Sequence, residues 1–324
     1  MWQPADQTLW LGHVDSEEGA LGIRWHQQVQ PLLVDDAEQV PGSVLLGFAC
    51  DAGVVRNHGR AGAVGGPAAV RKLLVNCAWH QTRPVYDGGN VLCEGDALEA
   101  AQFVLGTHVA AALEAGHLPL VIGGGHEVAW GSWQGLATWA MKQPAQRVGV
   151  LNFDAHFDLR AGEVGTSGTP FRQISEDCAA RGWPFRYACF GVARPTNTAA
   201  LFARAQALNV CWVEDDQLAP WLLDAARATL AAFLEQIDVL HLTIDLDVLP
   251  AANAPGVSAP AAHGVELAVL EVLIDQALAS GKVRLAEFAE LNPNFDLDGR
   301  TARIVVRLLE RIARGASAAR SESD

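Results

Sequence analysis

The sequence predicts an α/β protein with one three-layer α/β/α domain, in which a mostly parallel, doubly wound sheet lies between two layers of helices. Three observations support this fold class: short apolar runs recur along the chain, helical patterns alternate with them, and no Pro/Gly/Ser-rich linker divides them. Strands that alternate with helices pair in parallel and are buried on both faces, so their sequences are apolar throughout. We expect a single domain over residues 1–314 and a frayed tail over 315–324, which is rich in Ala, Ser and charged residues.

Seven apolar runs have the length and composition of buried strands. In chain order they are 44–49, 119–122, 148–153, 187–192, 210–213, 239–244 and 283–289. Six segments have helical patterns, and several of them follow Pro or Gly and end at Gly or His. They are 66–79, 97–115, 198–207, 216–236, 264–280 and 300–313. Ligands of such sheets bind beyond the carboxyl ends of the strands, so functional side chains are expected there.

Composition excludes several classes of partner. The 324 residues include 23 Lys and Arg against 37 Asp and Glu, a formal net charge of −14, which disfavours binding to nucleic acid or to anionic membranes. No run reaches the ~18 consecutive apolar residues of a membrane helix, and the N-terminus lacks the regions of a secretory signal. Six isolated cysteines without a CxxC motif fit reduced thiols. We expect a cytoplasmic protein that acts on a small molecule.

A glycine-rich segment ending in a histidine follows the predicted strand at 119–122. It reads Gly-Gly-Gly-His-Glu over residues 123–127. The glycines allow a close approach of backbone and let His126 project beyond the strand end. Taken alone this is a weak signal, because a tight turn with a structural histidine explains it equally well.

Two further predicted strands end in closely spaced acidic residues. In an extended chain, Asp154, His156 and Asp158 share one face after the run at 148–153. A solvated edge strand would also alternate in this way, but the preceding run is entirely apolar at 148–151. Asp245 and Asp247 share a face after the run at 239–244. Two carboxylates so close in a medium of low dielectric constant repel each other unless a cation neutralises them.

Together these segments offer four Asp and two His as metal ligands: His126, Asp154, His156, Asp158, Asp245 and Asp247. Two divalent cations would balance the four carboxylates, and because a carboxylate can bridge, the resulting binuclear site could still hold one hydroxide. A set rich in oxygen and free of sulfur favours Mn²⁺ over Zn²⁺ without excluding Zn²⁺. We expect two Mn²⁺ per subunit.

These motifs resemble those of the ureohydrolases, the arginase and agmatinase superfamily of binuclear manganese amidine hydrolases, from about residue 44 to 310. The resemblance implies that His126, Asp154, Asp158 and Asp245 hold one metal ion. It implies that Asp154, His156, Asp245 and Asp247 hold the other, with Asp154 and Asp245 bridging. The segment Glu-Leu-Asn-Pro at 290–293 implies that Glu290 orients the substrate's amidine. Homo-oligomers are common in this family, so a homo-oligomer is expected.

One departure from the family pattern indicates a particular branch. Agmatinase-like members carry a histidine for proton transfer before Gly-Thr-Pro-Phe, whereas this chain has Ser167 there. Together with the strings at 56–63, 152–160 and 254–260, this resembles the formimidoylglutamase branch. Its substrate carries two carboxylates, and Arg60, Arg160 and Arg172 lie in glycine-bearing loops where guanidinium groups could pair with them. Each arginine taken singly is also compatible with a solvated surface position.

We favour Arg160 and Arg172 for substrate binding, with Arg60, Asn57 and Thr169 as further candidates. The resemblance implies attack of a metal-bridging hydroxide on N-formimidoyl-L-glutamate, giving L-glutamate and formamide, a late step of histidine degradation. Asp158 is expected to carry the proton to the departing amine, since Ser167 is no general base by itself.

Three alternatives remain open at this point. An agmatinase or guanidinobutyrase would release urea, although the missing histidine and the extra arginines disfavour a cationic substrate. A non-catalytic metal-binding protein on the same fold is the second. A two-metal phosphoesterase, which the ligand chemistry permits, is the third.

Overall fold

The computed structural model describes residues 1–33, 39–144 and 146–321. In this part of the chain ten strands form one sheet in the order β1-β4-β3-β5-β10-β9-β6-β7-β8, and β2 pairs with β4. Only β1 runs antiparallel to its neighbour. The strands are β1 (Trp2–Gln3), β2 (Gln30–Pro31), β3 (Ser43–Ala49), β4 (Val85–Leu92), β5 (Leu118–Ile122), β6 (Val148–Phe153), β7 (Tyr187–Val192), β8 (Cys211–Glu214), β9 (Val239–Asp245) and β10 (Val283–Ala289).

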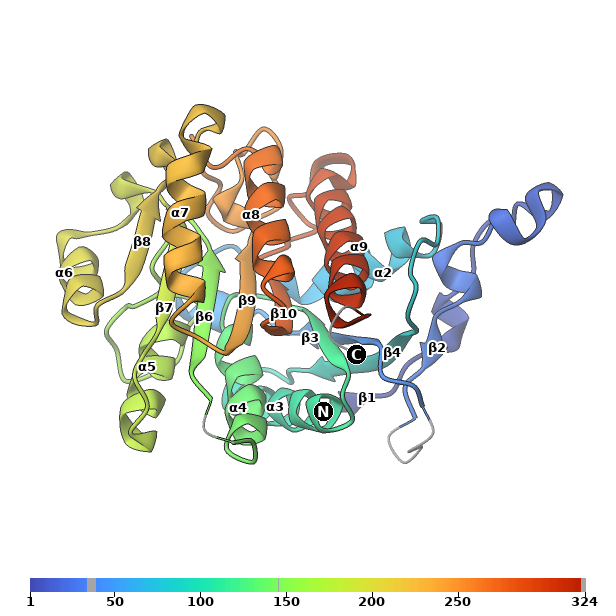
Figure 1. Ribbon diagram of the computed structural model, residues 1–324, viewed down its shortest axis with the longest axis horizontal. Coiled ribbons are helices and arrows are strands. Elements are labelled where there is room, and N and C mark those ends of the chain that lie inside the picture. The colour runs from blue at the N-terminus through green and yellow to red at the C-terminus, as the bar shows by residue number, and fades with distance from the viewer. Residues whose placement is uncertain (34–38, 145, 322–324) are drawn as a thin grey trace.

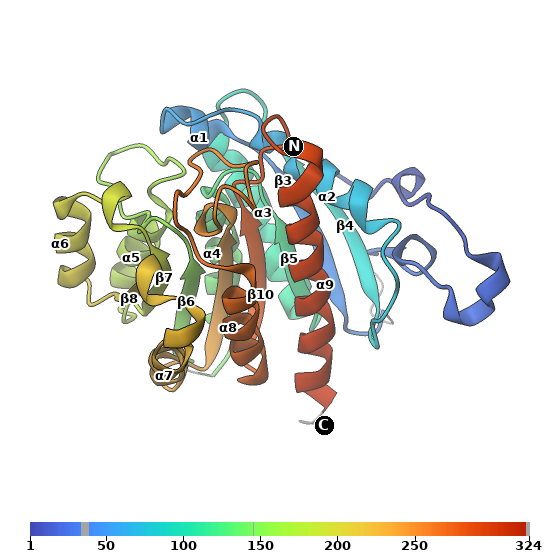
Figure 2. The ribbon, with the colours of Figure 1, turned by 90° about the horizontal axis from the view of Figure 1, so that it is seen from above.

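Helices cover both faces of the sheet, as Figures 1 and 2 show. One layer contains α2 (Gly66–Leu74), α7 (Leu223–Leu234), α8 (Leu267–Ala279) and α9 (Arg300–Ser321), which share a hydrophobic core with the sheet. The second core joins the opposite face to α3 (Leu98–Glu114), α4 (Val128–Ala140), α5 (Pro170–Arg181) and α6 (Ala199–Ala207). The short helix α1 (Ala52–Arg56) follows β3. The predicted fold class is confirmed.

The four central strands end in register. Ile122 of β5 pairs with Phe288 of β10, Phe288 pairs with Ile244 of β9, and Ile244 pairs with Phe153 of β6. Because all four strands are parallel, the segments that leave them start from one row at the same edge of the sheet. These are the segments in which the sequence placed its metal ligands and Glu290.

Strand β4 was not predicted, because its Asp, Gly and Asn residues disfavour strands. Its polar side chains form hydrogen bonds and an ion pair with other buried residues of the chain. Buried Arg71 of α2 pairs with Asp87 at 2.8 Å and donates a hydrogen bond to Asn90 at 2.8 Å. The indole of Trp10 also donates to Asp87, at 2.9 Å. A satisfied ion pair thus allows a polar strand in the sheet interior.

Helix boundaries differ from prediction most at three places. Helix α2 ends at Leu74 rather than at 79. Helix α7 begins at Leu223 rather than 216, because two short 3₁₀ turns, one with Pro220 in its first turn, precede it. Helix α9 continues to Ser321, so helical backbone extends into the segment that we expected to be a frayed tail. Alanine and arginine in this segment favour helix. Residues 322–324 lie outside the described residues.

No helix of the described part of the chain is long and apolar enough to cross a membrane.

Candidate metal centre

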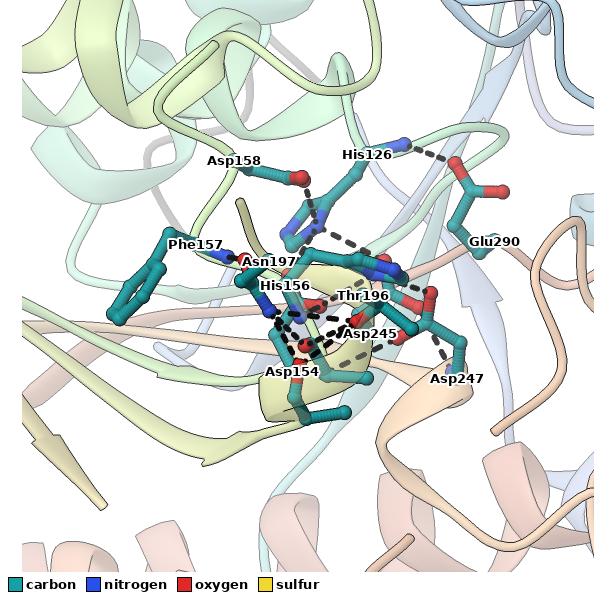
Figure 3. A network of polar contacts seen from close by, with 12 residues as sticks. His126, Asp154, His156, Phe157, Asp158, Thr196, Asn197, Asp245, Asp247 and Glu290 are labelled. Carbon is teal, nitrogen blue, oxygen red and sulfur yellow. Dashed lines mark hydrogen bonds and ion pairs between the residues drawn. The ribbon is translucent and has the colours of Figure 1, made fainter. Parts of the chain in front are cut away.

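The first part of the site surrounds His126, which follows β5. Its Nδ1 atom lies 3.1 Å from an oxygen of Asp154, 3.0 Å from one of Asp158 and 3.0 Å from one of Asp245. These donors come from the ends of three strands, β5, β6 and β9, and point toward one another (Figure 3). The four side chains could hold one metal ion.

The second part lies beside the first and shares Asp154 with it. His156 Nδ1 lies 3.0 Å from Asp247 and 3.5 Å from Asp154, and these three residues form the second group that could hold a metal ion. Asp154 is the residue common to both groups, and its role as a bridging ligand stays a prediction. Asp245 belongs to the first group only, so its bridging role stays a prediction.

Backbone and neighbouring side chains orient the ligands. The amide of His156 donates to Asp154 at 2.6 Å, and the amide of Asp247 donates to Asp245 at 2.9 Å. His126 Nε2 lies 3.0 Å from the hydroxyl oxygen of Thr243, a fully buried residue of β9. When Nε2 carries the proton and donates it to this hydroxyl, the lone pair of Nδ1 faces the three carboxylates, which is the tautomer of a metal ligand.

The carboxylates destabilise one another in the absence of a cation. Burial raises the pKa of Asp245 well above its ordinary value, and the charges of Asp247 and Asp154 raise it further. Burial and the charge of Asp154 raise the pKa of Asp158 to about 6. Burial would also raise the pKa of Asp154, but the imidazoles of His126 and His156 beside it hold that pKa below its ordinary range. A compact acidic cluster of this kind favours binding of divalent cations.

The donors therefore fit a pair of divalent metal ions. In the part of the chain that the structure describes, buried His126 Nδ1 has no hydrogen-bond partner, although oxygens of three carboxylates lie within 3.1 Å of it. Oxygen and imidazole donors without thiolate suit Mn²⁺, and their number is sufficient for two ions that share a carboxylate.

Glu290 follows β10 and lies next to this cluster. One of its carboxylate oxygens accepts a hydrogen bond from the amide of His126 at 2.9 Å, and the other has no partner among the described residues. Burial, with the charge of Glu127, raises the pKa of Glu290 to about 8. A bound cation or a cationic ligand would favour the ionised carboxylate, and its second oxygen could then accept a hydrogen bond from an N–H group of that ligand.

Two of these residues have strained backbone. Asp158 has φ 48° and Glu290 has φ 69°, in the left-handed region that side chains with a Cβ rarely adopt. Such conformations concentrate at functional sites, where the surrounding structure enforces them.

A pocket opens over the cluster, and its wall contains some but not all of the predicted substrate-binding residues. Asn57, Arg60, Arg160 and Ser167 line it together with His156, Asp158, Asp245, Asp247 and Glu290. The guanidinium of Arg60 donates to the carbonyls of Ser258 and Val257 and stacks on Phe295, so it mainly ties two loops together. Asn57 donates to the hydroxyl of Ser167 at 3.2 Å.

Thr169 and Arg172, which we expected to bind substrate, are not among the residues that line this pocket. Thr169 is buried, and its hydroxyl bonds with Thr166 and Gln173 at the start of α5. Arg172 donates to the carbonyl of Arg160 at 2.9 Å and pairs with Glu176 at 2.7 Å. Both residues therefore support the loop that carries Arg160.

Sequence reasoning missed residues that act through tertiary contacts. Thr243 orients His126, and Asn197 accepts from the amide of Phe157 at 3.1 Å and donates to the carbonyl of Ala155 at 2.8 Å. His58 lines the pocket, although it has no ligand-like neighbour in the sequence. The one available signal was the position of Thr243 as a polar residue within a buried strand.

The chain is similar in sequence to proteins of known family. Residues 42–314 match the model of the Arginase family. The chain is 55% identical over 318 residues to a formimidoylglutamase of Ralstonia nicotianae, covering 97% of both proteins. It is 56% identical over 312 residues to one of Aeromonas hydrophila, covering 96% of this chain and 98% of that protein.

The chain is also similar in structure to solved proteins. The formiminoglutamase of Trypanosoma cruzi with Mn²⁺ superposes with a TM-score of 0.75 at 27% identity, over 86% of this chain and 94% of that one. The formimidoylglutamase of Bacillus subtilis gives a TM-score of 0.79 over 91% and 92% of the two chains, and at 20% identity this likeness concerns the fold alone.

Proposed function

Since the chain belongs to the arginase family, we propose that it is a manganese-dependent amidine hydrolase that converts N-formimidoyl-L-glutamate and water to L-glutamate and formamide. The motif resemblance to the ureohydrolases is confirmed. One observation carries the proposal: a single pocket is lined by four residues of the metal-binding cluster, by Glu290 and by Arg160. An amidine that bears carboxylates matches all three.

The cluster and Glu290 are complementary to the reacting end of such a substrate. His126, Asp154, Asp158 and Asp245 would hold one Mn²⁺, and Asp154, His156 and Asp247 would hold a second, with Asp245 as a further bridging ligand. When bound, the two cations would lower the pKa of water in the site and thus supply a nucleophile near neutral pH.

Glu290 would accept a hydrogen bond from the protonated amidine through its unpartnered oxygen while the amide of His126 holds the other oxygen. This contact orients the amidine carbon and stabilises its positive charge. The nucleophile adds to that carbon, the bond from the carbon to the glutamyl nitrogen breaks, and the departing amine requires a proton. Asp158 lines the pocket, and we propose that it carries this proton.

Arg160 is the candidate for binding the substrate's carboxylates. It lines the pocket, and its backbone amide donates to Gly168 at 2.9 Å, which fixes the loop from which the guanidinium extends. A planar guanidinium can bind a carboxylate through two parallel hydrogen bonds. A cation at this position also disfavours agmatine, which is itself cationic.

The proposal is tested by reconstituting the protein with Mn²⁺ and measuring glutamate and formamide from N-formimidoyl-L-glutamate, with urea from agmatine, guanidinobutyrate and arginine measured in parallel. Glutamate and formamide without urea are expected. Urea production would instead indicate another activity of the same family, and the absence of any product would contradict catalysis by this site.

A pair of arginine variants tests the assignment of the carboxylate-binding residue. Arg160→Ala is expected to raise the KM for N-formimidoyl-L-glutamate at least ~10-fold, because a charge-assisted hydrogen bond is lost. Arg172→Ala is the matched control and should change KM less, since its guanidinium contacts Glu176 and the carbonyl of Arg160. A larger KM effect in Arg172→Ala would reverse the assignment.

A homo-oligomeric state and a cytoplasmic location stay predictions. Light scattering during size-exclusion chromatography would measure the first.

A further inference from the structure

His58 occupies an unfavourable backbone position. It follows α1, whose last turn is closed by hydrogen bonds from the amide of His58 to Val55 at 3.0 Å and from the amide of Gly59 to Val54 at 2.8 Å. His58 itself has φ 60°. A left-handed residue directly after a helix is usually glycine, because a Cβ makes this conformation costly.

No contact of its side chain explains why histidine stands there. The imidazole is exposed, and within the described part of the chain it has no hydrogen bond, ion pair or ring contact. Asn57, one residue earlier, contacts Ser167, and Arg60, two residues later, is bound to carbonyls of the 254–260 loop. The neighbouring side chains thus hold the loop in place, and the imidazole of His58 stays available.

His58 is one of the residues that line the pocket containing Glu290 and Arg160. Glu290 is buried at 5% exposure, whereas His58 is exposed, so the two residues mark the deep and the outer part of the pocket. A substrate whose amidine contacts Glu290 directs its most distant group outward. In N-formimidoyl-L-glutamate that group is the γ-carboxylate.

We infer that His58 determines specificity by donating a hydrogen bond from its imidazole to the side-chain carboxylate of the substrate, while Arg160 binds the carboxylate nearer the amidine. This inference rests on the proposed function. An imidazole N–H can donate one directional hydrogen bond to a carboxylate at the pocket rim, and the imidazole side chain is shorter than that of a second arginine. The free energy that His58 contributes to substrate binding would then offset the cost of its left-handed backbone conformation.

The test compares His58→Asn and His58→Gly with the wild-type protein, all loaded with Mn²⁺. Asparagine tolerates the left-handed conformation, and glycine prefers it, so both variants should fold and keep the wild-type metal content. The KM for N-formimidoyl-L-glutamate should rise about tenfold in both, with kcat within about twofold, as expected when binding is lost equally from ground and transition states. His80→Asn makes the same chemical change at an exposed residue that does not line the pocket, and it should leave KM unchanged.

N-Formimidoyl-L-glutamine, which has a neutral amide in place of the γ-carboxylate, identifies the group that is bound. The preference of the wild-type protein for the glutamate compound should fall about tenfold in His58→Asn. Unchanged KM and unchanged preference in both His58 variants would overturn the inference while leaving the proposed function intact. A wild-type protein without activity on N-formimidoyl-L-glutamate would overturn both.

Discussion

Replacing Asp245 by asparagine should have opposite effects on the metal-free and the metal-loaded protein. Asp245 is 2% exposed, and one of its oxygens lies 3.0 Å from His126 Nδ1 while the other accepts from the amide of Asp247 at 2.9 Å. Asparagine keeps the acceptor for the amide but removes the charge. Because burial and two neighbouring carboxylates raise the pKa of Asp245, the metal-free variant should be at least as stable as the metal-free wild type.

The metal-loaded protein should behave in the opposite way. An ion present at 100 times its Kd adds about 2.7 kcal/mol to the free energy of unfolding, so two ions add roughly 5 kcal/mol. At roughly 2 °C per kcal/mol for a large domain, Mn²⁺ should raise the wild-type Tm by about 10 °C. Asp245 is one of four donors in its group, and its loss should remove about half of that increase.

Thermal unfolding followed by circular dichroism, with Mn²⁺ or with a chelator, measures both effects. Asp298→Asn provides the matched control, because Asp298 is exposed, lies outside the metal-binding groups, and has φ 55°, a conformation that asparagine also tolerates. Equal Mn²⁺-induced increases of Tm in Asp245→Asn and the wild type would refute the ligand assignment. A metal-free variant less stable than the metal-free wild type by several kcal/mol would refute the proposed repulsion.

Three further predictions concern catalysis, pH and the fold. Glu290→Gln should lower kcat/KM about 100-fold, because an anionic acceptor for the amidine is lost, with bound manganese unchanged by elemental analysis; a loss below threefold would contradict its role. The carboxyl of Asp158, with pKa raised to about 6 from 3.8, keeps its proton in the folded protein where the unfolded chain has released it, so its contribution to metal-free stability falls as pH rises from about 4 to 6. Mn²⁺ must displace that proton, so Mn²⁺ affinity measured by calorimetry should weaken below about pH 6, and a pH-independent affinity would exclude Asp158 as a ligand. Asp87→Ala leaves buried Arg71 unpaired and should lower the free energy of unfolding by about 3–5 kcal/mol without changing KM; a melting temperature equal to that of the wild type would show that the pair is dispensable.

The sheet and the metal cluster could be predicted because each depends on a local pattern. Buried parallel strands are apolar along their whole length, and the ligands follow them directly. A run such as 148–153 therefore predicts both the strand and the position of Asp154 at its end. Strand β4 could not be predicted, since what permits it is the pairing of Asp87 with Arg71 of another element. Nothing in the sequence around Asp87 specifies that partner.

The residues around the cluster were harder to predict for a related reason. Proximity in sequence to the metal ligands suggested Arg172 and Thr169, but the turn into α5 directs both toward their own loop. His58 is more than sixty residues from the nearest of these ligands in the chain, and its loop is held at the pocket by contacts of Asn57 with Ser167 and of Arg60 with Ser258. Which side chains face a pocket depends on loop conformation, which local periodicity does not encode.

Stability and function are opposed at this pocket. In the described part of the chain five residues other than glycine have φ in the left-handed region, and three of them, His58, Asp158 and Glu290, line the same pocket. Each such conformation costs about 1–2 kcal/mol, and the repelling carboxylates add to that cost. The two large hydrophobic cores on either side of the sheet must supply the compensating stability, since neither depends on the site. Divalent cations would reduce the repulsion between the carboxylates but not the free-energy cost of the left-handed backbone conformations. Metal loading should therefore recover only some of the stability that the site removes, because the cost of the three left-handed backbone conformations remains when the metal is bound.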